Sequence, residues 1–471
     1  MVHRYTNNGY KIVMDVESGS IHVVDDIVYD LVGALEEYSE NHTVREVIDD
    51  ETIKAAPYED IREYLEGRLS GYDPGDISEA YEEVAWLIED ECLFTEDLYE
   101  DYIEDHSKRE TVVKALCLHI AHDCNLACKY CFAGEGEYHG ERSLMSLEVG
   151  KRALDFLVEA SKGRRNLEVD FFGGEPLMNF EVVKKLVEYG RSLEEKHNKN
   201  FRFTLTTNGV LLNDEVLEFA NREMGNLVLS IDGRKSVHDK MRPRRGGQGS
   251  YDEILPKFIK AAESRNQTNY YVRGTYTHHN LDFAEDVKHL AQLGFKQISV
   301  EPVVAPPDKD YAITPEDVAK LCEQYDILAK YVIDSKKEGK GFNFFHFMID
   351  LSGGPCVAKR LSGCGSGTEY LAVAPNGDLY PCHQFVGLDD FLMGNVRDGV
   401  TNNAMRDKFK LCNVYSRKEC RNCFAKFYCS GGCAANAYNF TGDINGVYDI
   451  GCALQRKRVE CAVMIKAAAD S

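Results

Sequence analysis

Between residues 111 and 303 the chain alternates six short apolar runs with longer segments in which apolar residues recur at helical spacing. Strand and helix signals that alternate in this way are typical of a parallel sheet whose strands are joined by helices. We therefore expect an α/β core in which six strand and helix units curl into part of a barrel. The six runs are VVKALCLHI, LEVDFFGG, FRFTLTTNG, NLVLSIDG, YYVRGTYT and QISVEPV.

The helical segments indicate where the helices begin, and the ends of the apolar runs indicate where the site lies. SLEVGKRALDFLVEA and NFEVVKKLVEYGRSLEEKH begin at Ser146 and Asn179, and both residue types are favoured N-caps. In barrels of this kind the chemistry lies at the carboxyl ends of the strands. The first run is followed by a loop with three cysteines, and the next three end in GGEP, TTNG and SIDG. The sequence therefore predicts a site where these four ends meet.

Residues 1–105 carry a different pattern. The stretch GYKIVMDVESGSIHVVD holds two alternating apolar runs around a Ser-Gly turn, which predicts a β-hairpin. Helices are expected after it, because Val84, Leu87 and Ile88 in the following acidic segment have helical spacing. We expect a small acidic α+β module, joined by the charged linker EDHSKRE to a barrel domain at residues 106–345.

From residue 346 to residue 471 glycine and cysteine become frequent and helical periodicity fades, as in LSGGPCVAKRLSGCGSG and CRNCFAKFYCSGGC. A segment with so little apolar material is expected to depend on bound metal for its fold. We therefore expect a third, cysteine-rich domain at residues 346–471.

Charge and cysteine content narrow the possible partners. Lys and Arg number 55 and Asp and Glu 78, which gives a formal net charge of -23 and disfavours nucleic acid as a partner. Neither a signal peptide nor a membrane span is expected, so we predict a cytoplasmic location. Sixteen cysteines in a reducing compartment predict metal or catalytic use. Those without matching spacing are expected to be small buried apolar residues, and they are Cys92, Cys117, Cys322, Cys412 and Cys461.

The loop AHDCNLACKYCFAGEG places Cys124, Cys128 and Cys131 in a CxxxCxxC pattern. Three thiolates on one loop can hold three irons of a [4Fe-4S] cube and leave the fourth iron without a protein ligand. An open position is what separates catalytic from structural metal sites. Two alternatives remain, a zinc site closed by a fourth ligand such as His122 or His139, and a redox thiol pair.

These three cysteines, with Tyr130 between the last two, resemble the signature of the radical S-adenosylmethionine superfamily. The resemblance implies a TIM-like (β/α)6 barrel with the three cysteines as catalytic ligands. It also implies that the open iron binds S-adenosyl-L-methionine, whose cleavage gives a 5'-deoxyadenosyl radical that takes hydrogen from an unactivated carbon.

Two further stretches resemble cofactor-binding elements of the same superfamily. GGEP resembles an element whose glycines let the backbone approach the cofactor and whose polar groups receive its ammonium. The first serine and the last arginine of SIDGRKSVHDKMR are similar to residues that contact the ribose and the carboxylate, although that arginine is also consistent with an ordinary surface residue. The resemblance assigns to the cofactor Tyr130, Gly173, Gly174, Glu175, Pro176, Ser230 and Arg242.

The C-terminal cysteines form a Cx12Gx4C pattern and a Cx2Cx5Cx3C pattern with one cysteine after it. Together they resemble the SPASM motif, which implies two auxiliary [4Fe-4S] clusters and so three clusters in all, while a pair of structural zinc sites is the alternative. Cys356 would either complete the first auxiliary cluster or leave that cluster with an open iron for a substrate thiolate. By position, the first auxiliary cluster would take Cys364, Cys382 and Cys433, and the second Cys420, Cys423, Cys429 and Cys452.

Residues 1–105 resemble a winged-helix-like recognition element that binds the leader of a ribosomally made peptide by pairing it with an exposed strand edge. A dimerisation module or a structural cap is the alternative. The acidity of this module favours a leader with Lys or Arg. In the order of its parts the whole chain resembles the thioether-forming maturases of the six-cysteines-in-forty-five (SCIFF) peptides, within the sactipeptide and ranthipeptide group.

This resemblance implies an oxidoreductase that joins a Cys sulfur to carbon in a Cys-rich precursor peptide, with an external electron donor of the flavodoxin or ferredoxin type. His383 stands where sulfatase-maturing relatives carry an Asp base, so formylglycine formation is disfavoured. Sulfatase-type maturation, carbon-carbon crosslinking, epimerisation and dehydrogenation remain as alternatives. So does a non-catalytic iron-sulfur or zinc protein that only binds a peptide.

Overall fold

The computed structural model describes the chain except for residues 49–51, 139, 350, 352–356 and 471. A twelve-stranded sheet forms its centre, and the six predicted strands lie side by side in it, each parallel to its neighbours. The prediction of a partial parallel barrel is confirmed. In order across the sheet these strands are β6 (Ala115–His122), β8 (Asn166–Gly173), β9 (Asn200–Thr207), β10 (Met224–Ser230), β11 (Tyr270–Tyr276) and β12 (Gln297–Pro302).

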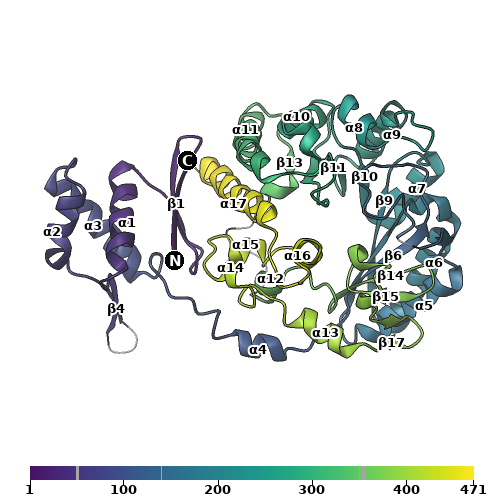
Figure 1. Ribbon diagram of the computed structural model, residues 1–471, viewed down its shortest axis with the longest axis horizontal. Helices are drawn as coiled ribbons and strands as arrows, with labels where there is room; N and C mark the ends of the chain where they lie inside the picture. The colour runs from purple at the N-terminus through teal and green to yellow at the C-terminus, as the bar shows by residue number, and fades with distance from the viewer. Residues whose placement is uncertain (49–51, 139, 350, 352–356, 471) are drawn as a thin grey trace.

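Helices between the strands cover the outside of the curled sheet (Figure 1). Ser146 caps the first of them by accepting a hydrogen bond from the Val149 N–H at 3.2 Å. Asn179 precedes the second helix but does not cap it, because its side chain donates to the carbonyls of Ile120 and Met145. The barrel helices are α5 (Leu147–Ala160), α6 (Phe180–His197), α7 (Asp214–Glu223), α8 (Lys235–Met241), α9 (Tyr251–Ser264), α10 (Phe283–Gln292) and α11 (Val318–Lys337).

The N-terminal module has its own apolar cluster, which includes Leu35, Leu65 and Ile88. The predicted hairpin is confirmed as β2 paired with β3, but β1 on its other side and the β4–β5 hairpin were not predicted. Winged-helix character stays a prediction. Its elements are β1 (Val2–Asn7), β2 (Tyr10–Asp15), β3 (Ile21–Val23), α1 (Asp26–Ser39), β4 (Arg45–Ile48), β5 (Thr52–Ala55), α2 (Tyr58–Arg68) and α3 (Pro74–Glu89).

The two edges of this small sheet have different surroundings. At the β1 edge, Tyr5 donates to the Glu460 carbonyl of α17 (Asp449–Asp470) at 2.9 Å, and Asn7 donates to Asp326 of α11 at 2.8 Å. Figure 1 shows β1 beside α17. Within the described residues β3 pairs only with β2, so its outer edge has no strand partner. The segment predicted as a linker contains one short helix, α4 (Ile103–Lys108).

The C-terminal region extends the barrel sheet. β14 pairs in parallel with β6, β15, β16 and β17 follow it in antiparallel order, β13 joins the opposite edge, and β7 pairs with β6. The expectation that helical character fades is wrong for α17, which spans 22 residues and buries Cys461, Val463 and Met464. The strands are β7 (Ser143–Leu144), β13 (Asn343–Phe344), β14 (Tyr370–Val373), β15 (Asp378–Tyr380), β16 (Gly394–Asn395) and β17 (Gly399–Val400).

Short helices fill the rest of this region, namely α12 (Val357–Ser362), α13 (Asn403–Lys410), α14 (Lys418–Arg421), α15 (Lys426–Cys429) and α16 (Ala434–Thr441). Because the sheet runs on from the barrel into this region, a boundary at residue 345 is not marked by a break in the sheet. Over the part of the chain that the structure describes, no helix combines the length and the apolar character that crossing a membrane requires.

Candidate functional site

The carboxyl ends of the barrel strands meet around a cavity of about 280 Å³. The structure brings together here every residue that the sequence assigned to the loop ligands and the cofactor. Polar residues that the sequence reasoning did not assign to the site, among them Asn208, Arg273 and Glu301, line the same space. The assigned residues are Cys124, Cys128, Tyr130, Cys131, Gly173, Gly174, Glu175, Pro176, Ser230 and Arg242.

The three loop thiols are free and face this cavity. Burial raises the pKa of Cys124 to about 11 and that of Cys128 to about 12, so both are protonated until a metal displaces the proton. Among the described residues no three His, Cys, Asp or Glu side chains converge as they would around one metal ion. Three thiols that line one cavity are the number that a cube with one open iron requires, and their role as iron ligands stays a prediction.

The proposed fourth zinc ligands give no support to the zinc alternative. The Nε2 atom of His122 lies 3.0 Å from Nδ1 of His119, and the His122 ring stacks on Tyr138 with centroids 4.6 Å apart. His122 is therefore engaged by His119 and by Tyr138, and it is not among the residues that line the cavity. His139 lies outside the described residues.

The Gly-Gly pair at the end of β8 packs against the backbone that leads into the cysteine loop. Gly174 donates to the Ala121 carbonyl at 2.7 Å, and a Cβ atom on Gly174 would lie 2.1 Å from the carbonyl oxygen of Asp123. Gly173 has φ +119°, and a Cβ there would meet the Ala121 oxygen at 2.4 Å. The sequence reasoning explained these glycines by close approach to a cofactor. In the structure their closest contacts are with the backbone of β6 and its loop.

Glu175 ties the ends of β8 and β9 together. Its carboxylate has no exposed surface and accepts hydrogen bonds from the Leu177 N–H at 3.0 Å, Thr207 Oγ1 at 2.9 Å and the Asn208 N–H at 2.8 Å. Burial raises its pKa to about 7, while these three donors act in the opposite direction. The role of Glu175 in receiving the cofactor ammonium stays a prediction.

Asp232 is a buried residue that the sequence reasoning quoted in SIDG without giving it a role. It accepts hydrogen bonds from the Tyr130 hydroxyl at 2.7 Å, Arg242 Nε at 2.9 Å and the Thr275 N–H at 3.0 Å. The Arg242 guanidinium also lies 5.3 Å from the centroid of the Tyr130 ring. The Arg242 side chain is only 13% exposed, so the alternative of an ordinary surface arginine is wrong. A carboxylate directly after a strand end is the signal that could have identified Asp232.

Arg273 and Glu301 face the cavity from the neighbouring strands β11 and β12. They form an ion pair with 3.1 Å between Arg273 Nη2 and Glu301 Oε1. Burial alone would raise the pKa of Glu301, but Arg273 and His346 lower it to about 2, so the carboxylate is ionised at neutral pH. His383 lines the same cavity near the rings of Phe132 and Phe172, and burial lowers its pKa to about 4.

The C-terminal cysteines fall into two groups. Burial is the main cause that raises the pKa of Cys429 to about 12, and the neighbouring thiols that add to it are Cys452, Cys420 and Cys423. For Cys382 burial again comes first, followed by the neighbouring thiols Cys433 and Cys364. These are the two sets that the sequence reasoning proposed, although their roles as iron ligands stay a prediction. Cys356 lies outside the described residues.

A second cavity of about 260 Å³ adjoins the first and is lined by Cys429, Cys433 and Cys452. The two cavities share Glu301 and Asn436 in the wall between them. Of the cysteines expected to be buried apolar residues, Cys117, Cys412 and Cys461 are buried, whereas Cys92 and Cys322 are only partly buried.

The protein is thus a partial parallel barrel that gathers three thiols and several polar side chains at the carboxyl ends of its strands, where barrel enzymes carry their active sites. Residues 118–293 match the radical SAM superfamily, and residues 364–424 match the SPASM iron-sulfur cluster-binding domain. The chain therefore contains a radical SAM domain and a SPASM domain. These two domains imply bound [4Fe-4S] clusters.

Similar proteins include the cysteine-type anaerobic sulfatase-maturating enzyme of Clostridium perfringens, which is 25% identical over 336 residues covering 66% of this chain and 85% of that enzyme. The radical SAM cyclopropyl synthase TigE of Paramaledivibacter caminithermalis is 21% identical over 378 residues, which cover 74% of each chain. The chain is thus a radical SAM/SPASM enzyme related to peptide maturases and sulfatase maturases.

Solved structures show the same fold. Native anSMEcpe with bound AdoMet matches with a TM-score of 0.63 and 20% identity, over 76% of this chain and 100% of that chain. SuiB of Streptococcus suis bound to its precursor peptide SuiA matches with a TM-score of 0.51 and 15% identity, over 93% and 96% of the two chains. The match to SuiB therefore covers nearly the whole chain.

Proposed function

We propose that this protein is a peptide maturase that installs intramolecular thioether crosslinks, Cys sulfur to carbon, in a Cys-rich ribosomal precursor peptide. The observation that carries the proposal is the pair of adjoining cavities, one lined by the three loop thiols and the other by three SPASM cysteines. A peptide segment in the first cavity would lie beside the second. When bound, the loop cluster and S-adenosyl-L-methionine supply a 5'-deoxyadenosyl radical, and two auxiliary [4Fe-4S] clusters complete the set of three.

The residues around the first cavity would bind and orient the reactants. Cys124, Cys128 and Cys131 would hold the loop cluster. Asp232 fixes Tyr130 and Arg242 for contact with the cofactor. The Arg273 guanidinium has five N–H donors, of which Glu301 takes only part, and its side chain is 46% exposed toward the cavity. Its remaining donors suit the carbonyls of a substrate peptide.

The N-terminal module would bind the leader of the precursor. Its β3 edge has no strand partner among the described residues, and Val23 on β3 is 48% exposed. An extended leader could pair there as a further strand, with main-chain hydrogen bonds providing affinity. Solved relatives are described with bound peptides, SuiA on SuiB and Cp18Cys on anSMEcpe, which supports a peptide partner. An external flavodoxin-type or ferredoxin-type donor and a cytoplasmic location belong to the same proposal.

The second candidate is formylglycine formation in a sulfatase. It is favoured by sequence relatives in Clostridium and Bacteroides that are named sulfatase-maturating enzymes. It is disfavoured by His383, which stands where those relatives are expected to carry an Asp base.

Mass spectrometry of a short Cys-rich precursor peptide, after anaerobic incubation with the reconstituted protein, tests the proposal. We expect a loss of two hydrogens per crosslink and no free thiol on the crosslinked cysteines. Cys131→Ala should abolish 5'-deoxyadenosine formation, whereas the control Cys322→Ala, on α11 and outside both cysteine groups, should not. A cysteine that loses sulfur and becomes an aldehyde would support the second candidate, and an unchanged peptide despite 5'-deoxyadenosine release would refute the first.

A further inference from the structure

Lys426 is a buried lysine inside the Cx2Cx5C part of the SPASM motif. Its side chain is 2% exposed, and its ammonium contacts Glu17 at 3.0 Å, Asp97 at 2.7 Å and the Arg421 carbonyl at 3.3 Å. All three N–H donors of the ammonium are therefore used inside the protein. A charge taken out of water is retained only where such partners compensate it, so these contacts determine where the side chain lies.

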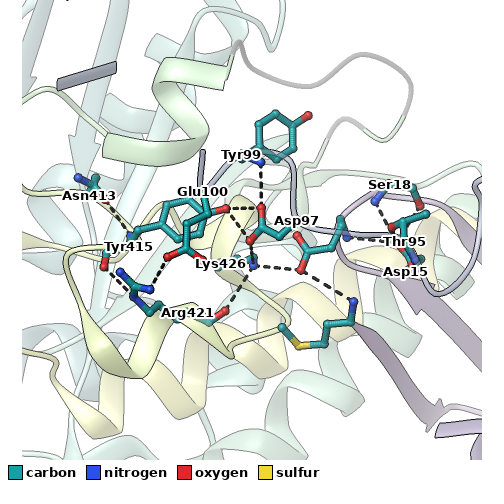
Figure 2. Close-up of polar contacts among 12 residues, drawn as sticks. Asp15, Ser18, Thr95, Asp97, Tyr99, Glu100, Asn413, Tyr415, Arg421 and Lys426 are labelled. Atoms are coloured by element: carbon teal, nitrogen blue, oxygen red, sulfur yellow. Dashed lines mark hydrogen bonds and ion pairs between the residues drawn. The ribbon is translucent and has the colours of Figure 1, made fainter. Parts of the chain in front are cut away.

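The partners of Lys426 come from two other parts of the chain (Figure 2). Glu17 lies in the turn between β2 and β3, and Asp97 lies in the connecting segment, residues 90–102, between α3 and α4. Asp97 also accepts from the Tyr415 hydroxyl at 2.6 and 2.7 Å and from the Tyr99 N–H at 3.0 Å. Burial alone would raise the pKa of Asp97, but the hydrogen bonds from Lys426 and Tyr415 lower it. The ammonium thus joins the N-terminal module, the connecting segment and the SPASM region at one point.

A second contact joins the N-terminal module to the cysteine-rich loop that carries Lys426. Phe424, which directly follows a motif cysteine, stacks on His3 of β1 with ring centroids 3.5 Å apart and planes 4° apart. Arg421 forms an ion pair with Glu100 of the connecting segment. The N-terminal module therefore contacts the loop that carries the second cysteine group through His3 and Glu17, whereas β3 pairs with no strand other than β2 among the described residues.

We propose that Lys426 is a positioning residue that holds the N-terminal module at a fixed place on the loop of the second auxiliary cluster. The inference rests on the proposed function, in which that module binds the leader at β3. A leader held in one place delivers its core peptide to the cavity as an intramolecular step with a high effective concentration. If the fastening loosens, the module samples many positions, and the concentration of core peptide at the cavity falls.

Hydrogen exchange without any peptide tests the fastening itself. In Lys426→Met, Asp97 loses its cation and Glu17 keeps only the Met1 ammonium at 3.9 Å, so the amide of Tyr99, which donates to Asp97, should exchange about tenfold faster or more. The matched control Lys418→Met removes an exposed lysine two residues before Cys420 and should leave this rate unchanged. Lys426→Arg, which keeps the charge, should recover part of the protection. Iron content and 5'-deoxyadenosine formation without peptide should match the wild type, because the cluster cysteines are intact.

Steady-state kinetics distinguish a positioning role of Lys426 from a merely structural one. For the full Cys-rich precursor we expect Lys426→Met to raise KM about tenfold with little change in kcat, and for the same peptide without its leader we expect no change in either. Unchanged Tyr99 exchange together with an unchanged KM would overturn the proposal. If Lys426→Met fails to fold, Asp97→Asn tests the same contact. If the wild-type protein modifies no peptide, the proposed function fails, while the exchange experiment still decides whether Lys426 fastens the module.

Discussion

Gly174→Ala separates two explanations of the Gly-Gly pair. The Cβ atom of the new alanine would lie 2.1 Å from the Asp123 oxygen and 2.6 Å from the Asp123 carbonyl carbon. Ordinary contact begins at 3.4 Å, so the two backbones must separate by about 1.3 Å (3.4 minus 2.1). Both atoms belong to the backbone and cannot move aside as a flexible side chain would. Asp123 directly precedes Cys124, so the displacement passes to the first thiol of the loop.

A displacement of this size should weaken the cluster site itself. Overpacking of a tight contact costs about 1–3 kcal/mol, and misplacing a reacting group by about 1 Å lowers activity on the order of 10²-fold. We expect Gly174→Ala, reconstituted anaerobically without S-adenosylmethionine, to lose one cluster's share of iron and to form correspondingly little 5'-deoxyadenosine. Gly163→Ala is the matched control, because its Cβ would meet nothing within 4 Å.

The opposite result would refute this reasoning. If Gly174→Ala keeps its full iron content without S-adenosylmethionine and loses only affinity for that cofactor, the glycine serves cofactor approach and not the packing of the loop. Iron content and cofactor affinity must therefore be measured separately, and both on the Gly163→Ala control.

Three further results are expected. Asp232→Asn leaves the Arg242 cation without its carboxylate and should lower the free energy of unfolding by about 3 kcal/mol in chemical denaturation, whereas Asp252→Asn at the exposed surface should change it little. Among the described residues neither ring nitrogen of buried His106 has a hydrogen-bond partner, and burial lowers its pKa to about 4. The folded state therefore resists protonation of His106 and loses stability as pH falls from about 6.5 to 4. His106→Gln should flatten the dependence of Tm on pH over that range, and parallel curves for the two proteins would contradict this. Val23→Lys should weaken binding of a fluorescent leader peptide at least fivefold without changing Tm, if the leader pairs with β3.

The barrel strands could be predicted because their signal is local. β6 is buried along its whole length, whereas β8 and β9 alternate buried with less buried positions, and each of these patterns can be read within a single run. The pairing of β14 with β6 gives no such signal, because it joins residues about 250 positions apart and nothing in either run specifies the partner. α17 was missed for a different reason. Much of its buried surface comes from small residues such as Cys461 and Ala462, which give a weak amphipathic pattern.

The residues of the candidate site also differ in whether the sequence alone could predict them. Chelation of one cluster by a short loop would be a local requirement, so the spacing of Cys124, Cys128 and Cys131 is enough to predict it. The residues that hold such a site in place are identified by their contacts with residues far away in the sequence. Residue type alone does not identify them. Asp232 is one carboxylate among many until Tyr130 meets it, 102 positions away. Lys426 is an ordinary lysine in a cysteine motif until folding places it against carboxylates 329 and 409 positions away, so no spacing could have identified it, whereas the place of Asp232 after a strand end was a signal.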